Sequence, residues 1–367
     1  MKVERAVLRQ VRLALAHPFE SSAGVVAERH ALLLTLHGEG LEGWSECVAP
    51  DTPHYTYETS GTAWQVLSEH VLPRAVGLDV TDPEAVLTAA EGVRGHPMAK
   101  ATLEMAAWDM AARAGGLPLT ELLGGTRTEV DVGVSLGMMP ASELGDVVEG
   151  HLADGYRRVK VKIGPGHDVG VLAALRARFP DVALWADANS AYTLEDAPRL
   201  AELDGLEVGL LEEPLAPGAF VDSARLQERL ATPVCLDESV SGTNDAATAL
   251  ALGSCRVVNL KPGRVGGFAS SLRTAEILVE GGVPVWCGGM LETGIGRAHN
   301  LALASLPAFT LPGDISASRR YWRQDIVSPE FEVVDGKMAV PAGQPGLGVE
   351  VDVERIETLT VRVAEFA

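Results

Sequence analysis

Five short apolar runs, each ending in a charged residue, recur at a nearly constant interval in the middle of the chain. They occupy residues 158–162, 184–187, 210–212, 234–237 and 257–261. Successive runs end 25, 25, 25 and 24 residues apart. A β-strand with its return helix needs about this many residues in a (β/α)₈ barrel of about 250 residues or somewhat fewer. We therefore expect an α/β barrel in which these runs are consecutive strands.

Further runs extend the barrel on both sides of this repeat. Residues 129–135 are expected to form the first strand, and a helix over about 141–154 leads to the second. Residues 283–287 are expected to form the seventh strand and residues 309–314 the eighth. The barrel domain is thus expected to span residues 126–319.

The chain before the barrel has a pattern typical of an α+β domain. It predicts antiparallel strands and then helices, over residues 1–18, 31–37, 43–47, 57–74, 83–93 and 97–115. The stretch 116–125, rich in glycine and proline, marks a boundary, so we assign residues 1–125 to this domain. Short strands return from about residue 320, with a hairpin signal at Asp335-Gly336. We expect residues 320–367 to pack back on the first domain and complete it.

The charged residue at the end of each periodic run belongs to the candidate site. In chain order these residues are Lys162, Asp187, Glu212, Asp237 and Lys261. Residues at the carboxyl ends of barrel strands carry the chemistry of this fold. The three carboxylates stand on adjacent strands, so they can converge on one hard divalent cation such as Mg²⁺. The two lysines stand four strands apart, on opposite walls of the barrel mouth.

This order of residues suits the removal of a proton from a carbon next to a carboxylate. The metal would stabilise the enediolate, one lysine would take the proton, and the opposite lysine would stabilise charge or return a proton. The use of lysine in this chain agrees with such a role, because only six of the 30 basic residues are lysine, and three of them, Lys160, Lys162 and Lys261, lie at or within two residues of these strand ends. Lys160 shares a strand face with Lys162, and a cationic neighbour favours the neutral amine that a base requires.

Composition and charge argue against several other classes of protein. With 47% hydrophobic and 22% charged residues, the 367-residue chain has an ordinary globular composition. The net charge of −20 argues against nucleic acid and anionic membranes as partners. Four scattered cysteines, no signal peptide and no membrane-length apolar stretch indicate a reduced, cytoplasmic protein.

Several stretches around the candidate residues are distinctive. They are the K-x-K strand at 160–162, Asp187-Ala-Asn189, Glu212-Glu-Pro214, Asp237-Glu-Ser239 and Lys261-Pro-Gly-Arg-Val-Gly-Gly267. Together they resemble the enolase superfamily, in its muconate-cycloisomerase-like subgroup. Two longer stretches, at 286–297 and 305–314, are similar to the N-acylamino acid racemase / o-succinylbenzoate synthase branch of that subgroup. The match runs through nearly the whole chain.

The resemblance implies a (β/α)₇β modified TIM barrel under an α+β capping domain. It implies Mg²⁺, Mn²⁺ or another divalent cation on Asp187, Glu212 and Asp237, with Lys162 and Lys261 as the acid/base pair. The substrate, a small carboxylate, would lie under the capping domain, and the protein would be a homo-oligomer. The residues expected to line, support or close this pocket are Lys160, Tyr55, Ser135, Asn189, Gly288, Gly289, Met290 and the loop 19–24.

Two reactions are associated with this branch. One is dehydration of succinyl-hydroxycyclohexadiene carboxylate to o-succinylbenzoate in menaquinone biosynthesis, with Lys162 acting as base and then as acid. The other is racemisation of N-succinyl or other N-acyl amino acids, in which both lysines exchange protons. Arg264, if it approaches Lys261, would help to keep that amine neutral and so favour racemisation. The physiological reaction, the preferred acyl group and side chain, and the metal stay open.

Three positions depart from the pattern of the branch. Glu213 stands where Gln is common, Ala23 where an aromatic residue is common, and His167 where Trp is frequent. We expect Glu213 to add negative charge beside Glu212, and Ala23 to widen the pocket or loosen its lid. These departures bear on substrate preference and leave the five central residues in place.

Other reactions of the superfamily fit the sequence less well. A muconate-type cycloisomerase would use the same five residues but matches the last two barrel strands less closely. A dipeptide epimerase usually carries Asp-x-Asp at strand eight, where this chain has Asp314-Ile-Ser316. A sugar-acid dehydratase or mandelate-type racemase would carry a His where this chain has Cys287-Gly-Gly. A barrel that only binds a metal or a partner would have no reason to place lysines on opposite walls.

Overall fold

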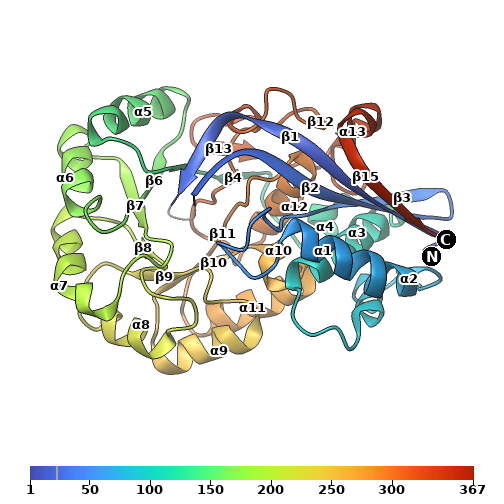
Figure 1. The fold of residues 1–367 in the computed structure, drawn as a ribbon, viewed down its shortest axis with the longest axis horizontal. Coiled ribbons are helices and arrows are strands. Elements are labelled where there is room, and N and C mark those ends of the chain that lie inside the picture. The colour runs from blue at the N-terminus through green and yellow to red at the C-terminus, as the bar shows by residue number, and fades with distance from the viewer. Residues whose placement is uncertain (22–23) are drawn as a thin grey trace.

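Seven parallel strands form a curled sheet in the larger part of the molecule (Figure 1). The structure is a computed structural model that describes residues 1–21 and 24–367. The strands follow one another across the sheet in chain order. They are β5 (Val134–Leu136), β6 (Arg158–Lys162), β7 (Ala183–Asp187), β8 (Leu211–Glu212), β9 (Val234–Leu236), β10 (Val257–Leu260) and β11 (Val285–Cys287). The five periodic runs are therefore consecutive parallel strands, as predicted.

Helices return the chain between these strands and cover the outside of the sheet (Figure 1). They are α5 (Ala141–Ala153), α6 (Val169–Arg178), α7 (Ala197–Leu200) with 3₁₀ turns at Leu194–Asp196 and Ala201–Leu206, α8 (Phe220–Gln227), α9 (Thr243–Leu252), α10 (Pro262–Val265), α11 (Phe268–Glu280) and α12 (Gly294–Ala304). Their apolar faces pack inward, and Leu172, Leu226 and Leu278 are fully buried. Each such leucine contributes about 1.5–3 kcal/mol to stability.

The first barrel strand is shorter than predicted. Only β5 joins the parallel sheet. The run before it forms β4 (Glu129–Asp131), which pairs antiparallel with β13 (Lys337–Ala339) from the C-terminal part of the chain. The Asp335-Gly336 hairpin precedes β13, with both residues at positive φ and Val334 bridged to Lys337. The hairpin prediction is thus confirmed, but its second strand pairs beside the barrel and not in the capping sheet.

The eighth barrel strand is absent as a regular strand over residues 309–314. Single bridges tie Phe309 to β11 and Gly313 to Val132, and these close the ring. Pro312 has no N–H group to donate, so a continuous ladder is interrupted here. The prediction of a regular strand at this place was wrong, although the segment occupies the expected position in the ring.

An antiparallel sheet of four strands forms the core of the capping part, in the order β15-β1-β2-β3. Its strands are β1 (Arg5–Ser21), β2 (Gly24–Gly38), β3 (Leu41–Cys47) and β15 (Thr360–Phe366). The last strand of the chain thus pairs with the first, and the two ends of the chain lie close together (Figure 1). The division of the chain at residues 125 and 320 stays a prediction.

Short helices and strands complete the capping part and the C-terminal segment. They are α1 (Ser60–Val66), a π-helical turn at Leu67–Val71, α2 (Leu72–Ala75), a 3₁₀ helix at Pro83–Ala90, α3 (Pro97–Ala114), α4 (Leu119–Leu122), a 3₁₀ turn at Ser318–Arg320, β12 (Val327–Ser328), β14 (Glu350–Val351) and α13 (Val353–Leu359). None of the helices in the described ranges is long and apolar enough to cross a membrane.

Strand β2 is apolar on both faces because both faces of the capping sheet are covered. Leu32, Leu34 and Leu36 pack into a core shared with α1 and α3. Ala31 and Leu33 point the other way and belong to the core that continues into the barrel. A strand buried on both sides needs a continuous apolar run, since successive side chains alternate between faces. This packing fixes the capping sheet against the barrel.

Two buried carboxylates of the capping part bind the first turns of barrel helices. Glu46 of β3 accepts hydrogen bonds from Thr293 N at 2.9 Å, Thr293 Oγ1 at 2.6 Å and Gly296 N at 3.2 Å, at the start of α12. Glu104 of α3 accepts from Phe268 N at 2.8 Å and Ala269 N at 2.9 Å, at the start of α11. The first N–H groups of a helix lack partners within the helix, and an acidic side chain satisfies them.

Glu46→Gln should remove a pH-dependent loss of stability. Burial, with the nearby Glu292 carboxylate, raises the pKa of Glu46 to about 7, whereas Glu in an unfolded chain titrates near about 4.3. The contribution of Glu46 is therefore full below about pH 4.3 and is lost as the pH rises through 7, by about 3 kcal/mol. Denaturant unfolding at pH 5 and pH 8 should show this loss in the wild type and not in the variant.

The exposed Glu4→Gln serves as the control for this measurement. Glu4 is exposed on the capping sheet, so its replacement should leave the wild-type pH dependence in place. The same change of unfolding free energy with pH in the wild type and in Glu46→Gln would contradict the prediction.

Candidate active site

The residues predicted from the strand ends meet at one mouth of the barrel. Lys162, Asp187 and Glu212 are the last residues of β6, β7 and β8, and they are direct neighbours in the strand register. Asp237 and Lys261 directly follow β9 and β10. Strands β6 and β10 stand four positions apart in the sheet. The two lysines therefore approach the mouth from different sides, with the carboxylates between them.

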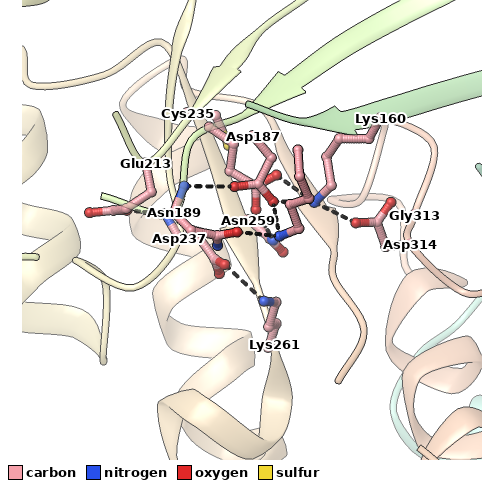
Figure 2. A network of polar contacts seen from close by, with 12 residues as sticks. Lys160, Asp187, Asn189, Glu213, Cys235, Asp237, Asn259, Lys261, Gly313 and Asp314 are labelled. Atoms are coloured by element: carbon pink, nitrogen blue, oxygen red, sulfur yellow. Dashed lines mark hydrogen bonds and ion pairs between the residues drawn. The ribbon is translucent and has the colours of Figure 1, made fainter. Parts of the chain in front are cut away.

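Lys160 lies at the centre of this group (Figure 2). Its Nζ is 2.6 Å from Glu212 Oε2, 3.1 Å from Asp187 Oδ2 and 2.5 Å from Asp314 Oδ2. Burial alone would lower the pKa of Lys160, but the surrounding carboxylates, Asp314 first, hold it above its usual range. Lys160 is therefore a fixed positive charge that keeps three buried carboxylates together.

Lys162 is partly open to the space above the barrel. Its Nζ donates to Asp187 Oδ2 at 2.7 Å and to Asn189 Oδ1 at 2.5 Å. Asn189 in turn donates through Nδ2 to Glu238 Oε1 at 3.0 Å. Burial would raise the pKa of Asp187, but Lys162 and Lys160 hold it well below its usual range. The Lys162 amine is thus aimed by a carboxylate and an amide on the neighbouring strand.

Lys261 is held in a similar way on the opposite side. Its Nζ donates to Asp237 Oδ2 at 2.8 Å and to Tyr55 Oη at 3.0 Å. Burial would lower the pKa of Lys261, but its neighbours, Tyr55 and Glu212 first, raise it overall. Gly288 is required here, because a Cβ at that position would lie 2.6 Å from Lys261 Cε.

Arg264 approaches the same group through two partners that it shares with Lys261, Asp237 and Tyr55. Its Nη1 contacts Asp237 Oδ1 and donates to Tyr55 Oη at 3.1 Å, and its Nη2 donates to the Asn259 carbonyl at 2.6 Å. The guanidinium therefore forms an ion pair with the carboxylate that also binds Lys261. These contacts hold the Asp237 carboxylate in its position.

The carboxylate set fits a hard divalent cation in its chemistry. Asp187, Glu212 and Asp237 are at most 1% exposed and stand on three adjacent strands, and oxygen is the ligand atom that Mg²⁺ and Mn²⁺ prefer. As they stand, the carboxylates pair with Lys160, Lys162, Lys261 and Arg264. Within the described residues, no three acidic, histidine or cysteine side chains are grouped as a ready metal site. The ion pairs thus occupy the carboxylate oxygens that a cation would need.

A cavity of about 990 Å³ lies between this mouth and the capping part. Of the sequence-predicted residues it is lined by Lys160, Lys162, Lys261, Asp187, Asn189, Ser135, Tyr55, Gly289 and Met290, and by Phe19 and Gly24 of the predicted closing loop. The lining of this cavity does not include Glu212, Asp237, Arg264 or Gly288. The departure at Ala23 lies outside the described residues.

Sequence reasoning did not assign a site role to three residues that matter here. Asp314 ends the segment in the place of the eighth strand and pairs with both Lys160 and Arg158, the latter at 2.5 Å. Glu238 lines the cavity, and one of its carboxylate oxygens has no hydrogen-bond partner among the described residues. Arg29 lines it from the capping sheet. The position of Asp314 at a barrel strand end is a signal that could have found it, whereas Arg29 carries no such signal.

Glu213 is buried directly after Glu212, whose negative charge helps to raise its pKa, but its side chain is bound to the turn after β9. Its carboxylate is directed away from Lys160 (Figure 2) and accepts hydrogen bonds from Asp237 N at 2.6 Å and from the Ser239 hydroxyl. Burial raises the pKa of Glu213 to about 7. The residue therefore holds the turn after β9, and a glutamine could make the same bond to Asp237 N. His167 forms a short bridge with Gly164 at the rim.

Lys160→Met should destabilise the protein strongly in the absence of a divalent cation. It would leave the buried carboxylates of Asp187, Glu212 and Asp314 without their shared cation, and breaking a buried ion pair costs about 3–5 kcal/mol. Denaturant unfolding in EDTA measures this loss, and added Mg²⁺ should reduce it. Lys337→Met removes an exposed pair with Glu129 and should change stability by less than about 1 kcal/mol. Wild-type stability of Lys160→Met would contradict the prediction.

Two family models together match most of the chain. Residues 143–356 match the enolase C-terminal domain-like family, and residues 3–124 match the N-terminal domain of mandelate racemase / muconate lactonizing enzyme. The chain belongs to the enolase superfamily. Enzymes of this superfamily depend on a divalent metal, generally Mg²⁺, which agrees with the donor set at the barrel mouth.

Superfamily relatives match this chain from end to end. The N-succinylamino acid racemase of Thermus thermophilus is 50% identical over 362 residues, which cover 98% of each chain. The o-succinylbenzoate synthase of Geobacillus stearothermophilus is 46% identical over 362 residues, covering 98% of this chain and 96% of the relative. The crystal structure of an enolase-superfamily member from Listeria innocua superposes with a TM-score of 0.95 at 39% identity, covering 100% and 99% of the two chains. The predicted barrel with a capping domain is confirmed.

Proposed function

We propose that this protein racemises N-succinylamino acids by removing the proton α to the carboxylate on one face and returning a proton on the other. The observation that supports this most is the placement of two lysines. Lys162 at the end of β6 and Lys261 after β10 line one cavity from strands four positions apart. A substrate held between them would have one amine on each face of its α-carbon.

The surrounding residues support the assignment of one lysine to each face of the α-carbon. Asn189 and Asp187 aim the Lys162 amine, while Tyr55 and Asp237 aim the Lys261 amine. In each direction of racemisation one lysine takes the α-proton and the other, as an ammonium, gives its proton to the opposite face. Lys160 keeps its charge throughout, because three carboxylates surround it.

Asp187, Glu212 and Asp237 are the residues that would hold a divalent cation. Bound there, the cation would supply positive charge for the negative charge that develops on the substrate carboxylate, and it would favour the neutral form of a nearby lysine. The chain's own part is to bury these three carboxylates together and to keep Lys160 beside them.

Dehydration to o-succinylbenzoate is the second reaction that we propose for the same residues. The relatives named o-succinylbenzoate synthase from two Geobacillus species are both 46% identical to this chain over 362 residues. In this reaction Lys162 would serve first as base and then as acid, while Lys261 stabilises charge. Both reactions begin with loss of a proton next to a carboxylate, so one site can carry both.

Dipeptide epimerisation is less well supported by the site. The first Asp of the expected Asp-x-Asp pair, Asp314, is committed to ion pairs with Lys160 and Arg158. A dipeptide epimerase from Cytophaga hutchinsonii shares the fold with a TM-score of 0.92, but at 21% identity. That likeness shows the fold alone.

We further propose that the protein works as a homo-oligomer in the cytoplasm. The four free cysteines, all buried as single thiols in the described structure, support a reducing compartment. Light scattering after size-exclusion chromatography would measure the oligomeric state, and a monomer at micromolar concentration would overturn that part of the proposal.

The first experiment measures exchange of the α-proton in D₂O by NMR. Both enantiomers of N-succinylphenylalanine would be tested with Mg²⁺, and with EDTA as the control. Exchange of both enantiomers, lost with EDTA, is the expected result. Exchange of neither enantiomer by folded protein saturated with Mg²⁺ would overturn the racemase proposal and leave dehydration to be assayed as the leading reaction.

A further inference from the structure

Arg29 is a buried cation that faces the cavity from the capping side. It lies on β2, is 3% exposed and lines the same cavity as Lys162 and Lys261. Among the described residues its hydrogen-bond partners are two backbone carbonyls, with Nη1 at 3.3 Å from Ala49 O and Nη2 at 3.3 Å from Val48 O. Its Nε is buried without a hydrogen-bond partner in the described structure. A guanidinium has five N–H donors, so most of them are unused.

The charge of Arg29 is also unbalanced at short range. No carboxylate oxygen of the described side chains lies within the 4.0 Å ion-pair distance of its nitrogens. The three lysines that line the cavity differ, since Lys160, Lys162 and Lys261 each pair with a carboxylate. Burying an unpaired charge is costly. A binding site for an anion would explain why such a charge is kept at the cavity wall.

The acidic residues of the capping part near this wall are already engaged. Glu28 pairs with Arg12 at 2.7 Å. Asp51 accepts hydrogen bonds from Ser60 Oγ at 2.8 Å and from His30 N at 3.2 Å. Neither carboxylate is therefore left to neutralise Arg29. The Glu46 carboxylate, whose pKa the charge of Arg29 lowers, is engaged with Thr293 and Gly296 at the start of α12. An anion in the cavity would give the guanidinium a close partner that these carboxylates do not provide.

We propose that Arg29 binds the distal carboxylate of the succinyl group, which both candidate substrates carry. The inference rests on the proposed function, because it takes the reacting carboxylate to lie at the barrel mouth. The second carboxylate then extends toward the capping sheet, where the guanidinium can donate two parallel hydrogen bonds to it. Arg29 thus selects dicarboxylates of the N-succinyl type over neutral N-acyl amino acids.

Substrate pairs that differ only at the distal group test this role. N-succinylphenylalanine is compared with its succinamoyl analogue, in which a primary amide replaces the distal carboxylate. Binding to the Mg²⁺-loaded protein is measured by calorimetry, and kcat and KM by NMR. Wild type, Arg29→Met and Arg29→Lys are compared, with Arg12→Met as the matched control, since Arg12 is 60% exposed on the neighbouring strand and pairs with Glu28. Thermal unfolding checks that each variant is folded.

The expected results separate recognition from a structural role. Wild type should bind the succinyl compound about 10- to 100-fold more tightly than the analogue, as a charged hydrogen-bonded pair allows. Arg29→Met should lose this preference, mainly through a higher KM for the succinyl compound. Its affinity for the analogue should stay within about threefold of the wild-type value. Arg29→Lys should keep part of the preference, and Arg12→Met all of it.

Three results would overturn the proposal. Equal binding of the two compounds by wild type would do so without any variant. Equal loss for both compounds in Arg29→Met, or an unchanged preference, would show that Arg29 only ties β2 to the Val48–Ala49 segment, or that backbone amides of the 289–291 turn bind the distal group. Selective binding of the succinyl compound without α-proton exchange or dehydration would instead overturn the proposed function and leave the Arg29 site standing.

Discussion

Replacing Lys162 with alanine should stop exchange of the α-proton in one enantiomer of N-succinylphenylalanine while the other enantiomer continues to exchange. Lys261→Ala should do the reverse. The two amines stand on strands four positions apart, on different sides of the carboxylate group, so each can reach only one face of a bound α-carbon. Removing a general base lowers the rate by about 10²- to 10⁴-fold. Both variants should lose racemisation, because it needs both faces.

NMR in D₂O with each pure enantiomer measures these rates separately. Lys337→Ala is the control, because Lys337 is exposed, lies on β13 and pairs with Glu129. It should exchange both enantiomers at wild-type rates. If Lys162→Ala continued to exchange both enantiomers, or if the two variants lost the same enantiomer, the assignment of one lysine to each face would be wrong.

Glu212→Gln should remove most of the response of the enzyme to Mg²⁺. Glu212 is fully buried, with one oxygen bound to Lys160 and the other to Asn259. Loss of its charge should weaken cation binding and lower turnover at least about 100-fold, because a bound cation supplies several kcal/mol of charge stabilisation. Calorimetric titration with Mg²⁺ and the Mg²⁺ dependence of α-proton exchange measure the two effects.

The adjacent residue offers a close control for this variant. Glu213→Gln makes the same chemical change one position further along, but that side chain faces Asp237 N and Ser239. It should bind Mg²⁺ with nearly wild-type affinity and keep turnover within about tenfold. Equal losses in the two variants would mean that the effect comes from disturbing the end of β8 and not from a ligand.

The periodic part of the fold was predictable because strand and return helix are local units. Their combined length sets the interval between strand ends, and so it placed Lys162, Asp187 and Glu212 as neighbours before any contact was known. The closure of the ring was not predictable in the same way. It depends on single bridges such as that of Val132 with Gly313, far apart in the sequence, and on a proline that interrupts the last strand.

In the candidate site too, some features were predictable from the local sequence and others depend on contacts between distant segments. Strand ends indicate which side chains reach the mouth, but not which partners they find there. Asp314 reaches Lys160 across the closure of the ring, and Arg29 reaches the cavity from a different sheet. Glu213 has a backbone φ of 34°, in the left-handed region that non-glycine residues seldom use. Its partners, Asp237 N and the Ser239 hydroxyl, lie after the next strand, so its place in the sequence does not indicate them.

The pairing of β15 with β1 has a consequence for the synthesis of the protein. The register joins Ala6 to Phe366 and Val11 to Thr360, so β1, which also pairs with β2, receives this second partner only after residues 360–366 have been made. Until then one edge of β1 is open, at a time when exposed strand edges favour wrong pairing. A chain that stops before residue 360 would contain every residue of the barrel mouth, but its capping sheet would lack β15. The capping sheet is thus begun before the barrel and completed after it.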